Sequence, residues 1–151
     1  MKTLATDRAQ ITAAIAKFDP AVARMIRAVR AVLQERFPTF ELAYDNYNFF
    51  VIGYCSTERP SDCIVSIAAD ANGVGLSFYR GADISDPRGL LAGSGKQNRF
   101  LRLPGGAETL ALPGVAELLN VAEAQAPTPM RDRGALVTIM RSVSLKQRPR
   151  R

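Results

Sequence analysis

Apolar residues recur at three- and four-residue steps in the first part of the chain, which is the spacing of a helix with one apolar face. The first such segment runs from Asp7 to about Lys17, and Asp7 is in position to cap it. Asp19-Pro20 then supplies an N-cap followed by proline at the first helical position, which predicts a second helix to about Phe37. The apolar positions of the two helices are Ile11, Ala14, Ile15, Phe18, Val22, Met25, Ile26, Val29, Val32 and Leu33.

From Glu41 onward the spacing changes from helical to extended, and aromatic and β-branched residues become frequent. Asn72-Gly73 predicts a tight turn between two of the extended segments, because both residues tolerate positive φ. Strands joined by such turns form an antiparallel meander, which can place one face under the helices and leave the other free to bind a ligand. The predicted strands are Glu41 to Tyr47, Phe49 to Cys55, Cys63 to Asp70, Val74 to Arg80 and Gln97 to Leu103.

The rest of the chain predicts one more helix and one more strand. Pro113-Gly114 leads into a helix from about Val115 to Gln125. The segment from Ala135 to Val143 is apolar and β-branched, and we expect it to form an edge strand, through which a homodimer could pair. The predicted fold class is therefore α+β, with two N-terminal helices and one later helix packed on a five- to six-stranded, mainly antiparallel sheet.

The formal charge of +6 belongs to one end of the chain. Basic and acidic side chains balance within residues 1–130, and the excess lies in residues 131–151. A length of 151 residues with 47% apolar composition supports one core and not two. We therefore expect residues 1–143 to form a single domain and residues 144–151 to form a basic C-terminal tail. A solvated tail is the simpler interpretation, and weak, non-specific contact with nucleic acid is the alternative.

The absence of histidine excludes several kinds of catalytic and metal site. A chain without imidazole can build neither a Ser-His-Asp triad, nor a Cys-His pair, nor an H-E-x-x-H zinc site. The two cysteines, Cys55 and Cys63, flank a predicted hairpin loop and could face each other across two strands; we expect reduced thiols. The charged N-terminus and the lack of a long apolar stretch predict a cytoplasmic protein that does not contact a membrane.

Gly93-Ser94-Gly95-Lys96 is the first candidate binding segment. Its glycines would let backbone N–H groups converge on an anion, and Lys96 adds a positive charge. It is not a Walker A loop, because the spacing and the residue after Lys96 are wrong. On a strand, Lys96 and Arg102 would share one face, and Arg99 would lie on the other. An anion or carboxylate site is one interpretation, and a solvated strand behind a flexible loop is the simpler one.

An aromatic and amide cluster is the second candidate. Aromatic walls with a few directed polar groups are typical of small-molecule pockets, but aromatics at alternating strand positions are also typical of cores. We expect Phe49, Phe50 and Phe78 to pack in the core. The residues with a candidate ligand-binding role are Tyr44, Asn46, Arg80, Lys96, Arg99 and Arg102.

Several of these blocks together resemble the YdhG-like family of small α+β domains. The resemblance is carried by residues 44–50, by Phe78-Tyr79-Arg80-Gly81, by residues 91–103 and by the basic end at residues 146–151. It implies a single α+β domain with a mostly antiparallel sheet, grouped by shape with frataxin-like iron chaperones. Clustered carboxylates would be the signature of iron binding. The two predicted N-terminal helices lack them, since they carry Asp7, Asp19 and Glu35 against Arg8, Lys17, Arg24, Arg27, Arg30 and Arg36.

These observations predict a non-catalytic module that binds a small ligand or anion. The alternative is an intracellular iron or metal carrier of the frataxin-like type. An enzyme is less favoured, because no convergent acid and base are visible without histidine. No cofactor, catalytic residue or metal ligand is predicted.

Overall fold

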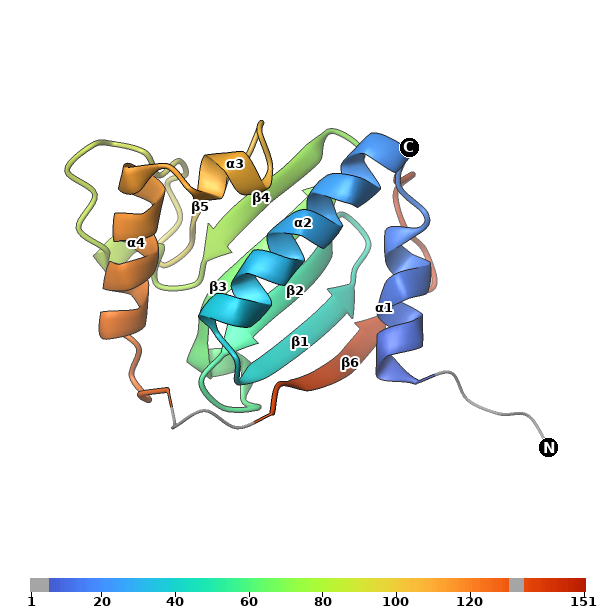
Figure 1. Ribbon diagram of the computed structural model, residues 1–151, viewed down its shortest axis with the longest axis horizontal. Coiled ribbons are helices and arrows are strands. Elements are labelled where there is room, and N and C mark those ends of the chain that lie inside the picture. Colours follow the sequence, from blue (N-terminus) through green and yellow to red (C-terminus); the bar gives the residue numbers. More distant parts are fainter. Residues whose placement is uncertain (1–5, 131–134) are drawn as a thin grey trace.

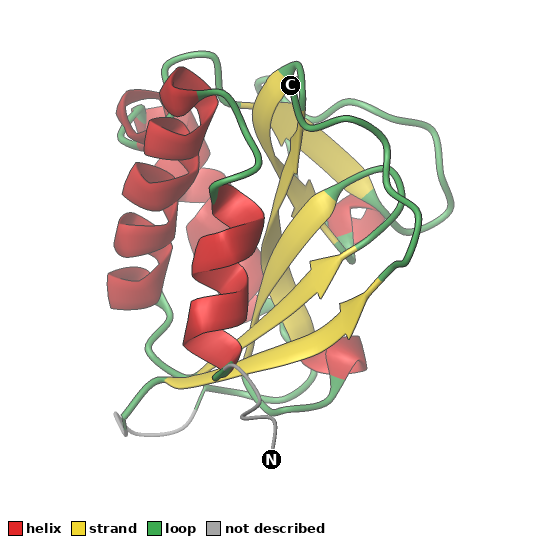
Figure 2. Ribbon diagram, turned by 90° about the vertical axis from the view of Figure 1, so that its right-hand side faces the viewer, coloured by secondary structure: helices red, strands yellow, loops and turns green. Residues whose placement is uncertain are grey.

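The protein consists of one layer of helices packed on one six-stranded sheet (Figure 1). The computed structural model describes residues 6–130 and 135–151. Viewed along the sheet, the α-helices lie on one side of the strands, and the opposite side carries loops and short helical turns (Figure 2). The predicted α+β fold class is confirmed. The helices are α1 (Asp7–Ile15), α2 (Pro20–Arg36), α3 (Ala107–Leu110) and α4 (Pro113–Ala124), with short 3-10 turns η1 (Pro60–Asp62) and η2 (Gly81–Asp83). The strands are β1 (Phe40–Asp45), β2 (Phe50–Cys55), β3 (Cys63–Asp70), β4 (Gly73–Phe78), β5 (Arg99–Arg102) and β6 (Val137–Val143).

The strand order β5-β4-β3-β2-β1-β6 combines a meander with one crossover. Strands β1 to β5 pair antiparallel with their chain neighbours. After β5 the chain passes through α3 and α4 and returns to the opposite edge, where β6 pairs parallel with β1. Parallel neighbours need such a long connection, which α4 provides. The predicted edge position of the last strand is confirmed.

The starts of α1 and α2 lie where the sequence predicted them, but the capping contacts differ. The side chain that caps α1 is Thr6 and not Asp7, because Thr6 Oγ1 accepts a hydrogen bond from the amide of Ala9 at 3.1 Å. Asp7 lies in the first turn, where a carboxylate is favourable beside the helix dipole. In α2, Asp19 and Pro20 occupy the N-cap and the first helical position, as predicted, but the Asp19 side chain makes no capping hydrogen bond in the described residues.

The core lies between the helices and the helix-facing residues of the sheet. In β2 every second residue faces the helices, and the rings of Phe50 and Tyr54 meet Phe18 and Phe37 at centroid distances of 6.3 and 6.4 Å. Phe50 is fully buried, as expected. Phe49 is not a core residue, because it immediately precedes β2 and its side chain lies on the opposite face of the sheet, 43% exposed. That expectation was wrong.

Strand β5 is shorter than predicted. The strand covers Arg99–Arg102 and not Gln97 to Leu103, because the chain folds back on itself before it. The amides of Ala92 and Phe100 donate to each other's carbonyl oxygens at 2.8 and 2.9 Å. Residues 93–98 therefore form the exposed tip of a small irregular hairpin.

A buried carboxylate, Glu41 of β1, lies between the sheet and α2. It is fully buried and accepts hydrogen bonds from Arg30 Nε and Nη2 at 3.0 and 2.9 Å. The Tyr54 hydroxyl and the Thr138 hydroxyl donate to it at 2.7 and 3.0 Å. Burial alone would raise the pKa of Glu41, but the hydrogen bonds and the charge of Arg30 outweigh it, so its pKa is lowered. The network joins α2, β1, β2 and β6.

A second buried carboxylate, Asp45, lies at the end of β1 and holds the C-terminal segment. Lys17 Nζ and Arg150 Nη2 donate to its two oxygens at 2.8 and 2.9 Å. The side chain of Arg150 is 3% exposed. The Gln147 side chain bridges the carbonyl of Asp45 and the ammonium of Lys17. Two cations therefore compensate one buried carboxylate.

The C-terminal segment is thus docked and not a separable solvated tail. Arg150 also donates to the carbonyl oxygens of Asn46 and Asn48, at 2.6 and 3.1 Å, and the Arg148 amide donates to that of Tyr47 at 2.8 Å. In the tight turn after β1, the carbonyl oxygens of Asn46 and Asn48 are not paired in the sheet, and the Arg150 guanidinium supplies their hydrogen bonds. Arg150 would therefore not take part in the predicted nucleic-acid contact, because its guanidinium is buried in an ion pair with Asp45.

Stability is expected to fall at acidic pH because of the two buried carboxylates. Burial opposes their ionisation, but the paired cations lower the pKa of both Glu41 and Asp45 below their ordinary values of 4.5 and 3.8. A lowered folded-state pKa gives stability above the ordinary pKa that is lost as pH falls through the folded value. Chemical denaturation should give a constant free energy of unfolding above about pH 5 and a decline below about pH 4. The decline should shrink in Asp45→Asn, and an unchanged stability at pH 3 in wild type would contradict this assignment.

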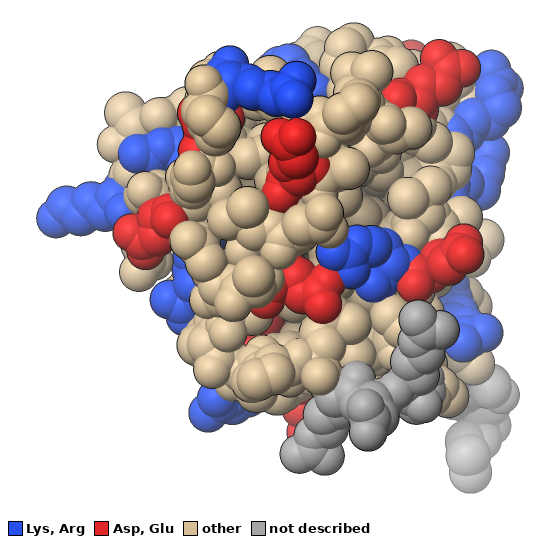
Figure 3. All heavy atoms as spheres, turned by 60° about the vertical axis from the view of Figure 1, so that its left-hand side comes forward, with Lys and Arg blue, Asp and Glu red and all other residues tan. Residues whose placement is uncertain are grey.

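The surface carries charges of both signs. Figure 3 shows the side of the molecule that lies at the left of Figure 1, and there Lys and Arg side chains alternate with Asp and Glu. On α4, Glu117 and Glu123 pair with Arg88 and Arg36. Within residues 6–130 and 135–151, no helix is long and apolar enough to cross a membrane.

Candidate ligand-binding groove

The face of the sheet opposite the helices is hollowed because its central positions carry small side chains. Strand alternation places Ser66 and Ala68 of β3 beside Gly75 and Ser77 of β4 on this face. Gly75 cannot be replaced without displacing the neighbouring strand, because a Cβ there would lie 2.9 Å from the carbonyl oxygen of Leu101. We call the resulting hollow the main groove; it has a volume of about 470 Å³.

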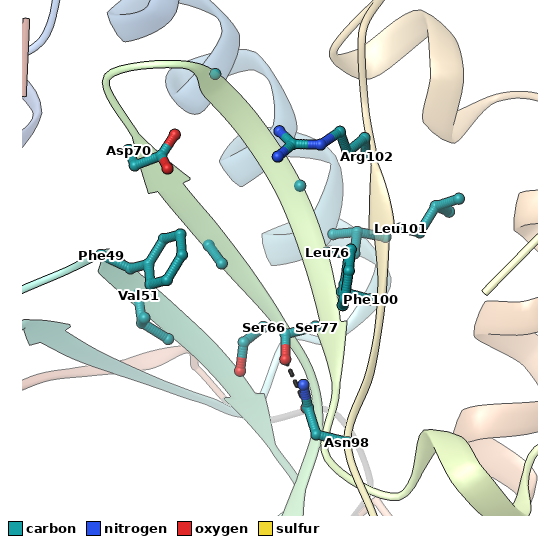
Figure 4. A pocket seen from close by; sticks show the side chains of 13 residues that line it. Phe49, Val51, Ser66, Asp70, Leu76, Ser77, Asn98, Phe100, Leu101 and Arg102 are labelled. Carbon is teal, nitrogen blue, oxygen red and sulfur yellow. Dashed lines mark hydrogen bonds between the residues drawn. The ribbon is translucent and has the colours of Figure 1, made fainter. Parts of the chain in front are cut away.

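Two phenylalanines form the sides of the main groove. Phe49 precedes β2, and Phe100 belongs to β5, so the rings come from opposite sides of the hollow (Figure 4). Both are large apolar side chains left at the surface, 43% and 44% exposed. Exposed aromatic walls around a hollow of this size are typical of a small-molecule site.

Polar groups lie at both ends of the main groove. At one end, the Ser77 hydroxyl donates to Asn98 Oδ1 at 2.7 Å, and Ser66 lies beside them (Figure 4). At the other end, Arg102 of β5 and Asp70 of β3 line the hollow from its two sides (Figure 4). Within the described part of the chain, Arg102 has neither an ion pair nor a hydrogen-bond partner. An exposed guanidinium in a groove is suited to bind a carboxylate or phosphate.

A second hollow continues the groove toward β1. We call it the cysteine hollow; it has a volume of about 360 Å³ and shares Ser66 and Ser77 with the main groove. Its lining residues are Tyr44, Asn46, Gly53, Cys55, Pro60, Cys63, Ser66, Ser77 and Tyr79. Burial raises the pKa of Tyr44, so its hydroxyl stays protonated at neutral pH and can donate a hydrogen bond.

The open face brings together three of the predicted ligand-binding residues. Arg102 lines the main groove, and Tyr44 and Asn46 line the cysteine hollow. Arg99 and Arg102 lie on opposite faces of β5, as predicted. Phe100 and Arg102 line the groove, whereas Arg99 is the cross-strand neighbour of Phe78, which is buried on the helix side of the sheet.

The other three predicted residues lie outside the groove. Lys96 is exposed at the hairpin tip before β5. Arg99 donates to the carbonyl oxygens of Gly95 and Asn98, so its charge holds the hairpin tip together. Arg80 stacks on the ring of Tyr79, 5.4 Å from its centroid, and donates to the carbonyl of Ser61 at 3.3 Å. The glycine-containing segment 93–96 therefore lies outside the lining of both hollows.

Sequence reasoning missed most of the residues that shape the main groove. Its floor and walls use Ser66, Asp70, Ser77, Asn98 and Phe100, none of which was a candidate. The available signal was the run Gly73-Val74-Gly75-Leu76-Ser77, in which small residues alternate with apolar ones. Such a strand buries one face and leaves the other face without side-chain bulk.

Within residues 6–130 and 135–151, no group of three or more cysteine, aspartate or glutamate side chains is placed to hold a metal ion. No protein-family model, curated protein or solved structure matches the chain. The resemblance to the YdhG-like family therefore stays a prediction from the motifs quoted above.

Proposed function

We propose that the protein is a binding module for a small planar organic anion, held in the main groove. The observation that carries this proposal is the placement of Arg102 beside a floor of small residues, between two exposed phenylalanines. Among residues 6–130 and 135–151 its guanidinium has no ion pair or hydrogen-bond partner. The guanidinium would bind a carboxylate in bidentate fashion, and the rings of Phe49 and Phe100 would cover the flat body of the ligand. The expected cytoplasmic location, with its reduced cysteines, belongs to this proposal.

The charge of the groove favours a ligand with a single anionic group. Asp70 lines the same hollow as Arg102, so a second negative charge at that end would meet a carboxylate. At the far end, Ser66, Ser77 and Asn98 offer hydroxyl and amide groups, which suit a neutral polar substituent. The volume of about 470 Å³ lies in the range of small-molecule sites.

Binding should depend on Arg102 and not on total charge. We expect native mass spectrometry and isothermal titration with a panel of aromatic monocarboxylates to identify at least one ligand, whose neutral amide analogue binds less tightly. Arg102→Gln should weaken its binding about tenfold to a hundredfold, since a charge-assisted contact is lost. Lys96→Gln is the matched control, because it removes the same charge from an exposed loop position outside the groove.

The second variant fills the floor of the main groove with a larger side chain. Ala68→Leu places a larger side chain in the main groove and should weaken the same ligand while the melting temperature stays close to that of wild type. Equal weakening by Lys96→Gln and Arg102→Gln would contradict the proposal, as would a panel with no ligand for the wild-type protein.

A further inference from the structure

The two cysteines face each other across β2 and β3. Cys55 and Cys63 are opposite each other in the antiparallel register, and both are free thiols. The amide of Ser56 donates to the carbonyl of Asp62 at 3.3 Å, directly beyond the two cysteines. The register shifts by one residue between Tyr54 and Cys55, so the cysteine pair lies at an irregularity of the ladder. Opposite residues of antiparallel strands have Cα atoms about 4.5–5.5 Å apart. This separation is within the range of roughly 4.4–6.8 Å that a disulfide spans.

The two thiols have different electrostatic environments. Their mutual interaction raises the pKa of Cys55 and lowers that of Cys63. Burial further raises the pKa of Cys55. The Ser66 hydroxyl lies 3.2 Å from Cys63 Sγ and also lowers the pKa of Cys63. Cys63 therefore carries the greater thiolate character, and the thiolate is the reactive form of cysteine.

The two cysteines differ in their access to solvent. Both line the cysteine hollow, but Cys63 is half-buried and Cys55 is only 1% exposed. Gly53 keeps the space beside them open, because a Cβ there would lie 3.2 Å from Cys63 Sγ. A small reagent in the hollow can thus approach Cys63 more readily than Cys55.

We propose that Cys55 and Cys63 form a dithiol site for hydroperoxides, which oxidise it to a reversible cross-strand disulfide. The sulfur of Cys63 attacks one peroxide oxygen, the O–O bond breaks, and the other oxygen leaves as water (or as an alcohol) after taking up a proton. Cys63 is then a sulfenic acid. Cys55 loses its thiol proton and attacks the sulfur of Cys63, so that the S–O bond breaks and water leaves. Both sulfurs are oxidised by one electron each, and the peroxide receives the two electrons.

The test uses hydrogen peroxide and the intact mass of the whole protein. Wild type treated with a small molar excess should stay monomeric and lose two hydrogen atoms in mass, and dithiothreitol should restore the original mass. Peptide mapping should find Cys55 joined to Cys63. A wild-type protein that stays reduced while free N-acetylcysteine is oxidised, that forms intermolecular dimers, or that gains oxygen atoms at one cysteine would overturn the proposal.

Single-cysteine variants separate the two roles. Cys55→Ser lacks the second thiol, so Cys63 should stop as a sulfenic acid that dimedone traps. Cys63→Ser retains only the buried Cys55, and its oxidation should be slower than that of Cys55→Ser by about tenfold or more. The reverse order of rates would overturn the assignment of Cys63 as the attacking sulfur. The wild-type measurement decides the disulfide itself if a variant fails to fold.

Discussion

Replacing Arg30 by alanine is expected to lower the free energy of unfolding by about 3–5 kcal/mol. The substitution leaves Glu41 ionised and fully buried without the guanidinium that donates two hydrogen bonds to it. The hydroxyls of Tyr54 and Thr138 would still donate, but they carry no charge to offset the cost of desolvating a carboxylate. Urea denaturation at neutral pH, followed by circular dichroism, measures the change.

Two controls distinguish the lost ion pair from a general effect on α2. Arg27→Ala removes an exposed arginine one turn earlier in the same helix and should change stability by no more than about 0.5 kcal/mol. The double variant Arg30→Met with Glu41→Leu removes both charges and should recover most of the stability, because apolar replacement of a buried pair is often neutral. A loss in the double variant as large as that in Arg30→Ala would contradict this account.

Replacing Arg150 by alanine is expected to cost about 3 kcal/mol of folding free energy, although the residue is next to the last position of the sequence. Asp45 would keep Lys17 but lose its more deeply buried cation. The carbonyl oxygens of Asn46 and Asn48 would lose their donor at the same time. Thermal and urea denaturation should both register the loss.

The matched control for this variant is Arg148→Ala. It removes one positive charge two positions away, but residue 148 is anchored to Tyr47 through its backbone amide, which alanine keeps. Its stability should therefore remain close to that of wild type. A change of similar size in both variants would show that net charge, and not the buried contact of Arg150, is responsible.

The secondary structure was predictable where a periodic apolar pattern coincides with a punctuating residue. The start of α2 was predicted from Asp19-Pro20, and the start of β4 from the Asn72-Gly73 turn, each to within one residue. The pattern could not resolve which residue caps α1, because Thr6 and Asp7 are both good caps. It also could not show that β6 returns to β1 in parallel, since that pairing depends on a crossover and not on local sequence.

The site was predictable only where strand alternation applied. Arg102 and Tyr44 lie within strands, and their placement on one face follows from the two-residue period. Lys96 and Arg80 lie in connecting segments, where no period fixes the direction of a side chain. The docking of Arg150 was hidden for a different reason: its partners, Asp45 and the turn after it, are distant in sequence and themselves polar.

The contact of Lys17, Asp45 and Arg150 joins the two ends of the described chain and so bears on the order of folding. Closing a loop of this length costs more entropy than forming the β1–β2 or β3–β4 hairpin, so the local elements assemble first. An interaction made after the rate-limiting step has little influence on how fast a protein folds and a large influence on how fast it unfolds. In this protein, the arginine beside the last position would therefore act mainly on the lifetime of the folded state.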